Sequence, residues 1–329
     1  MLGVAVVAAT FLFVLPRIAD YGDVWAVVKE LSWQQIGALV LATALNLVTF
    51  APPWMATLPR LGFRRAFVLT QASTASTYIA PGGAAVGVAL AYVILRGWGF
   101  AAGPVGLAVA LTGIWNQLAL LGFPAAALAL LTLQQEQNAL LQTVATIGLV
   151  VFVVAVAAFA FGLSTPKFAR LVGESAARLV NRGFRLVRRG PVGWNGDSFV
   201  RFRNEAIGLL RRRWHVLTFA TLAGQLTVFA LLLVSLRVLG VSPGEVSAVE
   251  AFAAWSLVRL LGSLPITPGG LGVVELGLTT ALVGFGGDNA EVVAAVLVYR
   301  FLTIVPTLVL GLIAGATWRR LTPARPQPT

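Results

Sequence analysis

The chain has 329 residues, of which 58% are hydrophobic and 11% charged, and its mean hydropathy is +0.87. This composition leaves too little polar surface for a water-soluble fold, so it excludes a soluble globular protein and indicates an integral membrane protein. The sequence contains no cysteine, which excludes disulfides and thiolate chemistry. We expect no catalytic residue, no metal and no cofactor, and we assign no role to the single histidine, His215, beside a basic run.

The formal net charge of +12 is concentrated in one segment of the chain. Half of the 24 basic residues fall between positions 164 and 213, which is the pattern of a cytoplasmic loop in a membrane protein. We therefore expect no nucleic-acid partner. These basic residues are Lys167, Arg170, Arg178, Arg182, Arg185, Arg188, Arg189, Arg201, Arg203, Arg211, Arg212 and Arg213.

Apolar runs long enough to cross a bilayer predict an all-α, polytopic helical bundle. About six full spans are expected near 1–16, 35–57, 104–133, 138–163, 214–240 and 289–318. Two further apolar stretches, 65–96 and 249–286, are each interrupted at the centre. We expect one integral membrane domain over 1–329, with a first half at 1–163, a cytoplasmic amphipathic loop at 164–213 and a second half at 214–320.

The charges of the loops predict the topology, because positively charged loops stay in the cytoplasm. Basic segments at 58–65, 164–213 and after 318 belong inside, and acidic or arginine-poor segments at 17–34, 134–138, 241–250 and 286–291 belong outside. With both termini cytoplasmic, each interrupted stretch must enter and leave on one side as a helical hairpin. Charge does not separate a re-entrant hairpin from two full crossings. The arm from Arg65 to Ala80, about 22 Å long at helical rise, favours re-entry.

Both hairpins contain the tripeptide Pro-Gly-Gly at the interruption. These residues are Pro81, Gly82 and Gly83 in the first hairpin, and Pro268, Gly269 and Gly270 in the second, where Gly272 follows. Because the hairpins open from opposite sides, they are expected to form an inverted repeat. Proline is expected to end each incoming arm, and the next helix N-terminus could then bind an anion. The alternative is that both are glycine-rich packing bends.

Three charged residues lie within the second half of the predicted bundle. Arg259, Glu275 and Arg300 are placed near the midplane or outer half of the bilayer, where a charge is costly and is normally paired and functional. Glu275 is expected to pair with Arg259 or Arg300, which leaves one arginine in excess. That arginine could bind a lipid phosphate, or the pairing could be purely structural.

The basic loop also has helical periodicity. From Phe168 to Val187, apolar residues recur at intervals of three and four with arginines between them, and a second such stretch runs from Phe199 to Leu210. This pattern is typical of an amphipathic helix on an anionic membrane surface.

Two segments of the second half carry a family resemblance. TPGGLGVVELGLTTAL, from Thr267 to Leu282, and YRFLTIVPTLVLG, from Tyr299 to Gly311, resemble the lysylphosphatidylglycerol synthase transmembrane region, a family of flippase-like membrane proteins. The resemblance implies a plasma-membrane protein that moves a polar-headed lipid between leaflets. It assigns Pro268, Gly269, Gly270, Gly272, Glu275 and Arg300 to the site. Because the sequence ends at Thr329 soon after its last span, the synthase activity is not carried over.

We therefore predict a flippase-like protein that translocates an anionic or aminoacylated lipid, bound where the hairpin tips converge. One alternative is a membrane-embedded enzyme or accessory protein acting on lipid-linked intermediates, for which Glu275 is the plausible acid. Another is a non-transporting scaffold that binds a partner through the basic loop.

Overall fold

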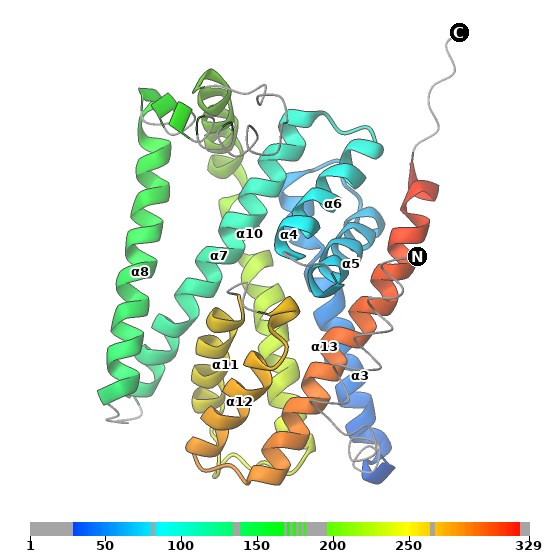
Figure 1. Ribbon diagram of the computed structural model, residues 1–329, viewed down its shortest axis with the longest axis vertical. Helices are drawn as coiled ribbons and strands as arrows, with labels where there is room; N and C mark the ends of the chain where they lie inside the picture. The colour runs from blue at the N-terminus through cyan, green and yellow to red at the C-terminus, as the bar shows by residue number, and fades with distance from the viewer. Residues whose placement is uncertain are drawn as a thin grey trace.

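The computed structural model describes residues 29–79, 83–133, 139–167, 196–263 and 267–322, together with single residues and pairs between 170 and 181. The described elements are helices (Figure 1). In chain order they are α3 (Trp33–Thr49), α4 (Pro52–Thr57), α5 (Phe63–Ile79), α6 (Gly83–Gly97), α7 (Ala102–Leu133), α8 (Ala139–Ser164), α10 (Gly196–Val238), α11 (Ala248–Gly262), η3 (Pro268–Gly270), α12 (Val273–Gly284), α13 (Asn289–Thr317) and η4 (Trp318–Leu321).

Five segments of the described chain are long and apolar enough to cross a membrane, so the protein is a multi-pass membrane protein. They are α3 with α4, most of α7, the second part of α8, α10, and α13 with η4. The predicted spans at 35–57, 104–133, 138–163, 214–240 and 289–318 are thereby confirmed as helices. The predicted span at 1–16 lies outside the described residues.

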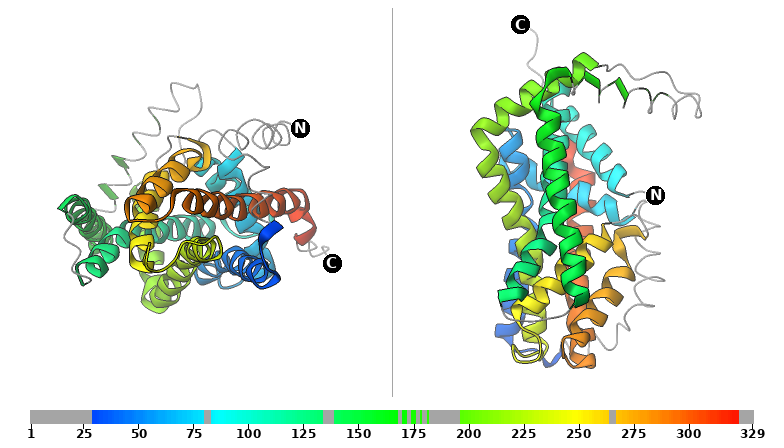
Figure 2. Two further views of the ribbon diagram at one scale, coloured as in Figure 1. Left: turned by 90° about the horizontal axis from the view of Figure 1, so that it is seen from below. Right: turned by 90° about the vertical axis from the view of Figure 1, so that its left-hand side faces the viewer.

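Helix α8 shows how the surface of the bundle meets its surroundings. It lies at the edge of the bundle beside α7 (Figures 1 and 2). Apart from Gly148, its apolar segment Thr146–Ser164 has no buried residue, and Val153 and Val154 are 55% and 60% exposed. Such a continuous aliphatic surface is stable against lipid and would aggregate in water.

The two interrupted stretches form the two helical hairpins. The α5–α6 pair lies in the upper half of the bundle and the α11–α12 pair in the lower half (Figures 1 and 2). Their helices contain 17, 15, 15 and 12 residues. At about 1.5 Å per residue they are roughly 18 to 25 Å long, shorter than a hydrocarbon core of about 30 Å. None of the four helices is long enough for a full crossing by itself, and re-entry of the two hairpins stays a prediction.

The two ends of the bundle carry opposite charge, as the loop charges predicted. The upper end in Figure 1 contains the start of α5, the end of α6 and η4, and the residues in and next to these elements include Arg60, Arg64, Arg65, Arg96, Arg319 and Arg320. The lower end contains the connections from α10 to α11 and from α12 to α13, which carry Glu245 and Asp288, and the first turn of α13, which carries Glu291. The first hairpin opens at the basic end and the second at the acidic end, which is the arrangement that the inverted-repeat prediction requires.

Helix α10 differs from the sequence-based expectation. It begins at Gly196, inside the predicted loop, and continues as helix to Val238. The stretch Phe199–Leu210 is helical as expected, but its apolar side is covered by protein. Ala206 is fully buried in a cluster with Leu107 of α7 and Leu163 of α8. Most of the stretch from Phe168 to Val187 lies outside the described residues.

Close packing of small residues joins the first hairpin to α13. A Cβ atom added at Gly311 would lie 2.2 Å from Cβ of Ala75 and 2.7 Å from the carbonyl oxygen of Gln71. The glycine therefore allows the α13 backbone to approach α5 directly, as small residues do between membrane helices. This contact holds the tip of the first hairpin against the helix that carries Arg300.

Candidate functional site

The tip of the second hairpin is a short turn between α11 and α12. Helix α11 ends at Gly262, so the prediction that Pro268 ends the incoming arm is wrong. Pro265 follows the C-cap Ser263 by two residues, and proline there prevents continuation of a helix. Pro268 instead begins the 3-10 turn η3. Gly269, Gly270 and Gly272 adopt φ values of +62°, +67° and +81°, which favour glycine and allow the tight return into α12.

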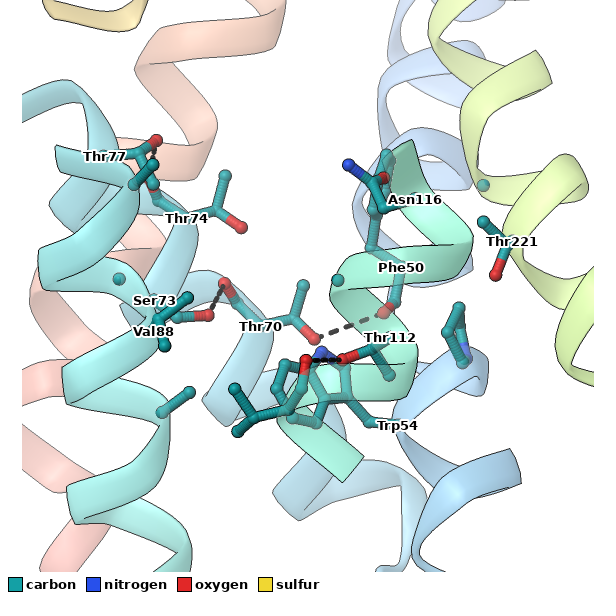
Figure 3. Close-up of a pocket in the computed structure, with 17 residues that line it drawn as sticks. Phe50, Trp54, Thr70, Ser73, Thr74, Thr77, Val88, Thr112, Asn116 and Thr221 are labelled. Carbon is teal, nitrogen blue, oxygen red and sulfur yellow. Dashed lines mark hydrogen bonds between the residues drawn. The ribbon is translucent and has the colours of Figure 1, made fainter. Parts of the chain in front are cut away.

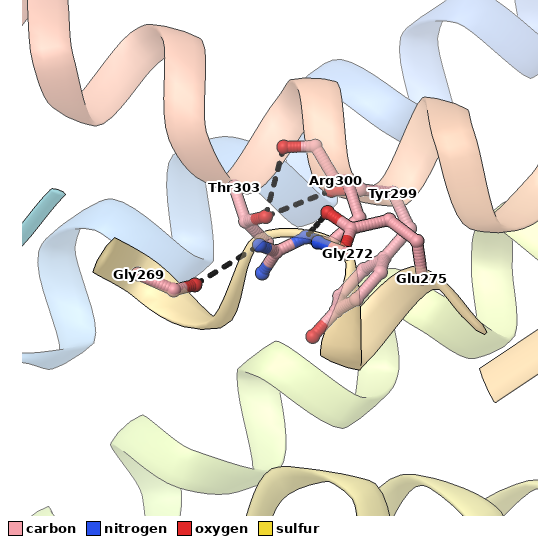
Figure 4. A network of polar contacts seen from close by, with 6 residues as sticks. All are labelled: Gly269, Gly272, Glu275, Tyr299, Arg300 and Thr303. Carbon is pink, nitrogen blue, oxygen red and sulfur yellow. Dashed lines mark hydrogen bonds and ion pairs between the residues drawn. The ribbon is translucent and has the colours of Figure 1, made fainter. Parts of the chain in front are cut away.

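A buried ion pair fixes this turn to α13 (Figure 4). Nε of Arg300 donates to Oε1 of Glu275 over 2.6 Å, and both side chains are buried. Nη2 of Arg300 donates to the carbonyl oxygen of Gly269 over 3.0 Å. The second carboxylate oxygen, Oε2 of Glu275, accepts from the backbone N–H of Gly272 over 2.7 Å. The sequence predicted that Glu275 pairs with either Arg259 or Arg300, and the structure shows the pair with Arg300.

The ion pair changes the role expected for the N-terminus of α12. Glu275 lies in the first turn of that helix, where a carboxylate interacts favourably with the positive end of the helix dipole. Because it also takes the Gly272 N–H, it already supplies an anion at this terminus. A ligand phosphate would have to displace it.

Arg259 is the second arginine near the turn, and it has no carboxylate partner among the described residues. Its Nε and Nη2 atoms donate to Oε1 of Gln225 on α10 over 3.2 and 2.9 Å. Nε2 of Gln225 in turn donates to Oδ1 of Asn116 on α7. The guanidinium also lies over the Trp255 ring, 5.8 Å from its centroid, a cation–π contact. Neutral groups thus hold the positive charge of Arg259 without cancelling it.

The tip of the first hairpin lies against the second. Pro81 and Gly82 fall outside the described residues, and Gly83 is the first residue of α6. A Cβ at Gly83 would lie 2.2 Å from the carbonyl oxygen of Thr77, so the two arms of this hairpin are in close contact. A Cβ at Gly269 would lie 2.3 Å from Cδ1 of Tyr78 in the last turn of α5. The two hairpins therefore meet tip to tip at Tyr78 and Gly269.

A cavity of about 350 Å³ lies at this junction, and we call it the polar chamber. Its volume is in the range that binds small molecules. Helices α5, α7, α10, α11, α12 and α13 all contribute to its wall. The lining residues are Phe50, Thr74, Thr77, Tyr78, Asn116, Gln117, Leu120, Gln225, Trp255, Val258, Arg259, Gly262, Ser263, Gly269, Val274, Leu278, Tyr299 and Arg300.

A second cavity of about 270 Å³, the apolar chamber, lies between the first hairpin and helices α4, α7 and α10 (Figure 3). Several hydroxyls in its wall donate to carbonyls of their own helices: Ser73 to Leu69, Thr77 to Thr74 and Thr112 to Ala108. Phe50, Trp54 and Val88 also line it, and carbon atoms provide most of its surface.

The two chambers are neighbours, and one of them opens at the surface. They share four lining residues, namely Phe50, Thr74, Thr77 and Asn116. Val88 on α6 lines the apolar chamber and is 53% exposed, so this chamber opens on the outer surface of the bundle.

A third cavity of about 100 Å³ borders the polar chamber and shares Arg259 and Arg300 with it. Asn46 in its wall is buried, and its Nδ2 has no hydrogen-bond partner among the described residues. No group of three acidic or histidine side chains that could hold a metal ion is found in the described parts of the chain. The polar side chains in the described lining of both cavities are therefore arginines, amides and hydroxyls.

The family model described as the lysylphosphatidylglycerol synthase TM region matches residues 1–311. The chain belongs to this family. No curated protein matches the sequence. Membership agrees with the all-α multi-pass bundle and with the resemblance of the segments around Glu275 and Arg300. The family description concerns a membrane region and by itself assigns this member no transported lipid.

Sequence reasoning located Arg259, Glu275 and Arg300 but missed part of their surroundings. The structure brings these three residues together with Gly269, Gly270 and Gly272, and it places Gly83 on the other hairpin. It adds Gln225, which orients Arg259, and Trp255, on which the guanidinium lies. The sequence does mark Gln225, since an amide inside the apolar span 214–240 needs a partner in a membrane. It does not mark Trp255, because tryptophan is common in apolar membrane helices.

Proposed function

We infer that the protein translocates a phosphate-containing, polar-headed lipid across the plasma membrane. The observation that carries this function is the adjacent pair of chambers, one polar and one apolar. The polar one contains Arg259, which has no carboxylate partner in the described part of the chain. A lipid has the matching chemistry, with a phosphate and polar group at one end and acyl chains at the other. Arginine binds phosphate oxygens through two parallel N–H groups.

The position of the chambers supports translocation rather than surface binding. The polar chamber lies where the hairpin tips meet, with the apolar chamber next to it, and the two hairpins open at opposite ends of the bundle. Binding sites at the interface of inverted repeats become accessible from alternate sides when one repeat moves against the other. In this proposal the headgroup enters the polar chamber while the acyl chains stay in the apolar chamber and the surrounding bilayer.

The charge distribution sets the proposed orientation. The basic end of the bundle faces the cytoplasm, so both chain termini lie on that side and the first hairpin enters from it. The arginines between 164 and 213 contact the anionic lipid of the cytoplasmic leaflet. Under this orientation the ion pair of Glu275 and Arg300 holds the outer hairpin in place while Arg259 binds the lipid phosphate.

Lipid movement in reconstituted vesicles tests the function. Phosphatidylglycerol labelled on an acyl chain is incorporated in both leaflets, and dithionite quenches the outer label. Wild-type protein is expected to expose the inner label faster than protein-free vesicles do. Arg259→Gln is expected to slow this rate by about tenfold or more, because a charge-assisted hydrogen bond to phosphate is lost.

Two control variants separate the local effect from a change in net charge. Arg259→Lys keeps the charge but loses the two parallel donors, so an intermediate rate is expected. Arg319→Gln removes an equal charge from an exposed position at the basic end and is expected to keep the wild-type rate. A wild-type rate equal to that of empty vesicles contradicts the function. An unchanged rate in Arg259→Gln contradicts the role of this arginine.

A further inference from the structure

We propose that the polar chamber selects anionic lipids whose headgroups bear hydroxyls, such as phosphatidylglycerol, and rejects lipids whose headgroups bear amines. The proposal rests on the proposed function in taking the chamber as a lipid site. It sharpens that function, because both anionic and aminoacylated lipids are candidates from the sequence alone.

The first step is the charge of the chamber. Arg300 and Glu275 form a neutral pair, whereas Arg259 contacts only the neutral Gln225 and the Trp255 ring among the described residues. Glu275 is also the only acidic residue that is buried among the described residues, and none of the three cavities has a described carboxylate in its lining. The chamber thus carries one uncompensated positive charge, which suits one phosphodiester.

The second step is the supply of acceptors for an amine. An ammonium group has three donors and needs acceptor oxygens or a carboxylate. Both oxygens of Glu275 already accept, from Arg300 and from the Gly272 N–H. Oε1 of Gln225 accepts twice from Arg259, and Oδ1 of Asn116 accepts from Gln225. A headgroup amine would therefore meet a like charge at Arg259, and the described lining of the chamber offers it no carboxylate, which is unfavourable.

The third step is the supply of groups for a hydroxylated headgroup. Hydroxyls both donate and accept, so they can bind to amide and hydroxyl side chains without a net charge. Gln117, Ser263 and Tyr78 line the same chamber as Arg259. The free Nδ2 of Asn46 adds a donor in the adjoining cavity. Arg259 thus supplies donors to an anionic phosphate, and the neutral amides and hydroxyls beside it can bind the hydroxyls of the headgroup.

Competitive binding tests the selectivity separately from transport. Purified full-length protein in detergent is mixed with equal amounts of phosphatidylglycerol and lysylphosphatidylglycerol, and the bound lipids are counted by native mass spectrometry. The wild type is expected to bind phosphatidylglycerol in about tenfold excess. Equal binding, or an excess of the lysyl lipid, overturns the proposal.

Gln225→Glu provides the sharpest variant, because it places a carboxylate on Arg259 with almost no change in shape. It is expected to reduce the preference about tenfold or to invert it. Asn204→Asp adds the same charge at an exposed position of α10 and is expected to leave the preference unchanged. If both variants shift the preference equally, the selectivity comes from the overall charge of the protein and the proposal fails.

Translocation of both labelled lipids in vesicles distinguishes this proposal from the function on which it rests. If both lipids move at equal rates and bind equally, lipid translocation stands and the selectivity is wrong. If phosphatidylglycerol is preferred in binding but neither lipid moves, the selectivity stands and the translocation function is wrong.

Discussion

Glu275→Gln is the substitution whose effect on stability follows most directly from the structure. It removes the negative charge and keeps the size of the side chain. Arg300 is only 7% exposed and would remain as a buried cation, with the Gly269 carbonyl and one neutral amide oxygen as its acceptors at the turn. Breaking a buried pair by removing one partner costs about 3–5 kcal/mol. At roughly 2–4 °C per kcal/mol, the melting temperature should fall by roughly 6–20 °C.

Thermal unfolding in detergent, followed by the fluorescence of the nine tryptophans, measures this change. Arg259→Gln is the matched comparison, because it removes a charge from the same region without breaking an ion pair. It should lower the stability by only about 1 kcal/mol, the net contribution of a typical hydrogen bond.

The double variant Glu275→Gln with Arg300→Gln isolates the pair. Since it leaves no buried charge, it should be less destabilised than the sum of the two single variants. A melting temperature of Glu275→Gln equal to that of the wild type, or strictly additive effects in the double variant, would refute the assignment of this pair as the support of the turn.

Three further expectations concern other parts of the molecule. Gly311→Leu should prevent the contact of α13 with Ala75 and reduce the yield of folded protein in size-exclusion chromatography, because there is no space for a side chain. Trp98→Phe removes the 3.0 Å hydrogen bond from Nε1 to the carbonyl oxygen of Trp318, and thermal unfolding should show a loss of about 1 kcal/mol. A reporter that is active only in the cytoplasm should be active when it is fused after η4, and a reporter that is active only after export should be inactive there. Activity of the export-dependent reporter would contradict the proposed orientation.

Hydropathy and charge were sufficient to predict the bundle. The described spans, the two hairpins and the charge of the two ends all follow from apolar run length and from the placement of arginines. These features depend on the properties of whole segments, so errors of a few residues do not alter them. The start of α10 at Gly196 was missed because residues 196–213 are too charged for a span, although Ala206 and its neighbours pack on α7 and α8.

The partners of individual side chains were harder to predict. Both Arg259 and Arg300 were within reach of Glu275 on the sequence, and the packing of α12 against α13 decides for Arg300. The end of α11 was misplaced because the prediction took the proline of the Pro-Gly-Gly motif, Pro268, as the end of the helix. Pro265 lies earlier in the chain, and α11 ends at Gly262. The role of Gln225 could not be predicted, because it depends on how α10 packs against α7 and α11, and no local sequence pattern encodes that packing.

The most direct test of the account is whether the junction of the hairpin tips contains water inside the membrane. The protein has no cysteine, so a single thiol can be introduced by Thr74→Cys, at a position that lines all three cavities. Val153→Cys on the exposed surface of α8 is the lipid-facing control.

Both variants are treated in membranes with charged, membrane-impermeant methanethiosulfonate reagents. The account predicts that Thr74→Cys is modified and Val153→Cys is not. It also predicts that the anionic reagent reacts faster than the cationic one at position 74, and that adding Arg259→Gln removes this difference. If Thr74→Cys remains as unreactive as Val153→Cys even in permeabilised vesicles, where the reagent reaches both sides of the membrane, the hairpin tips do not enclose a chamber that a polar headgroup can enter.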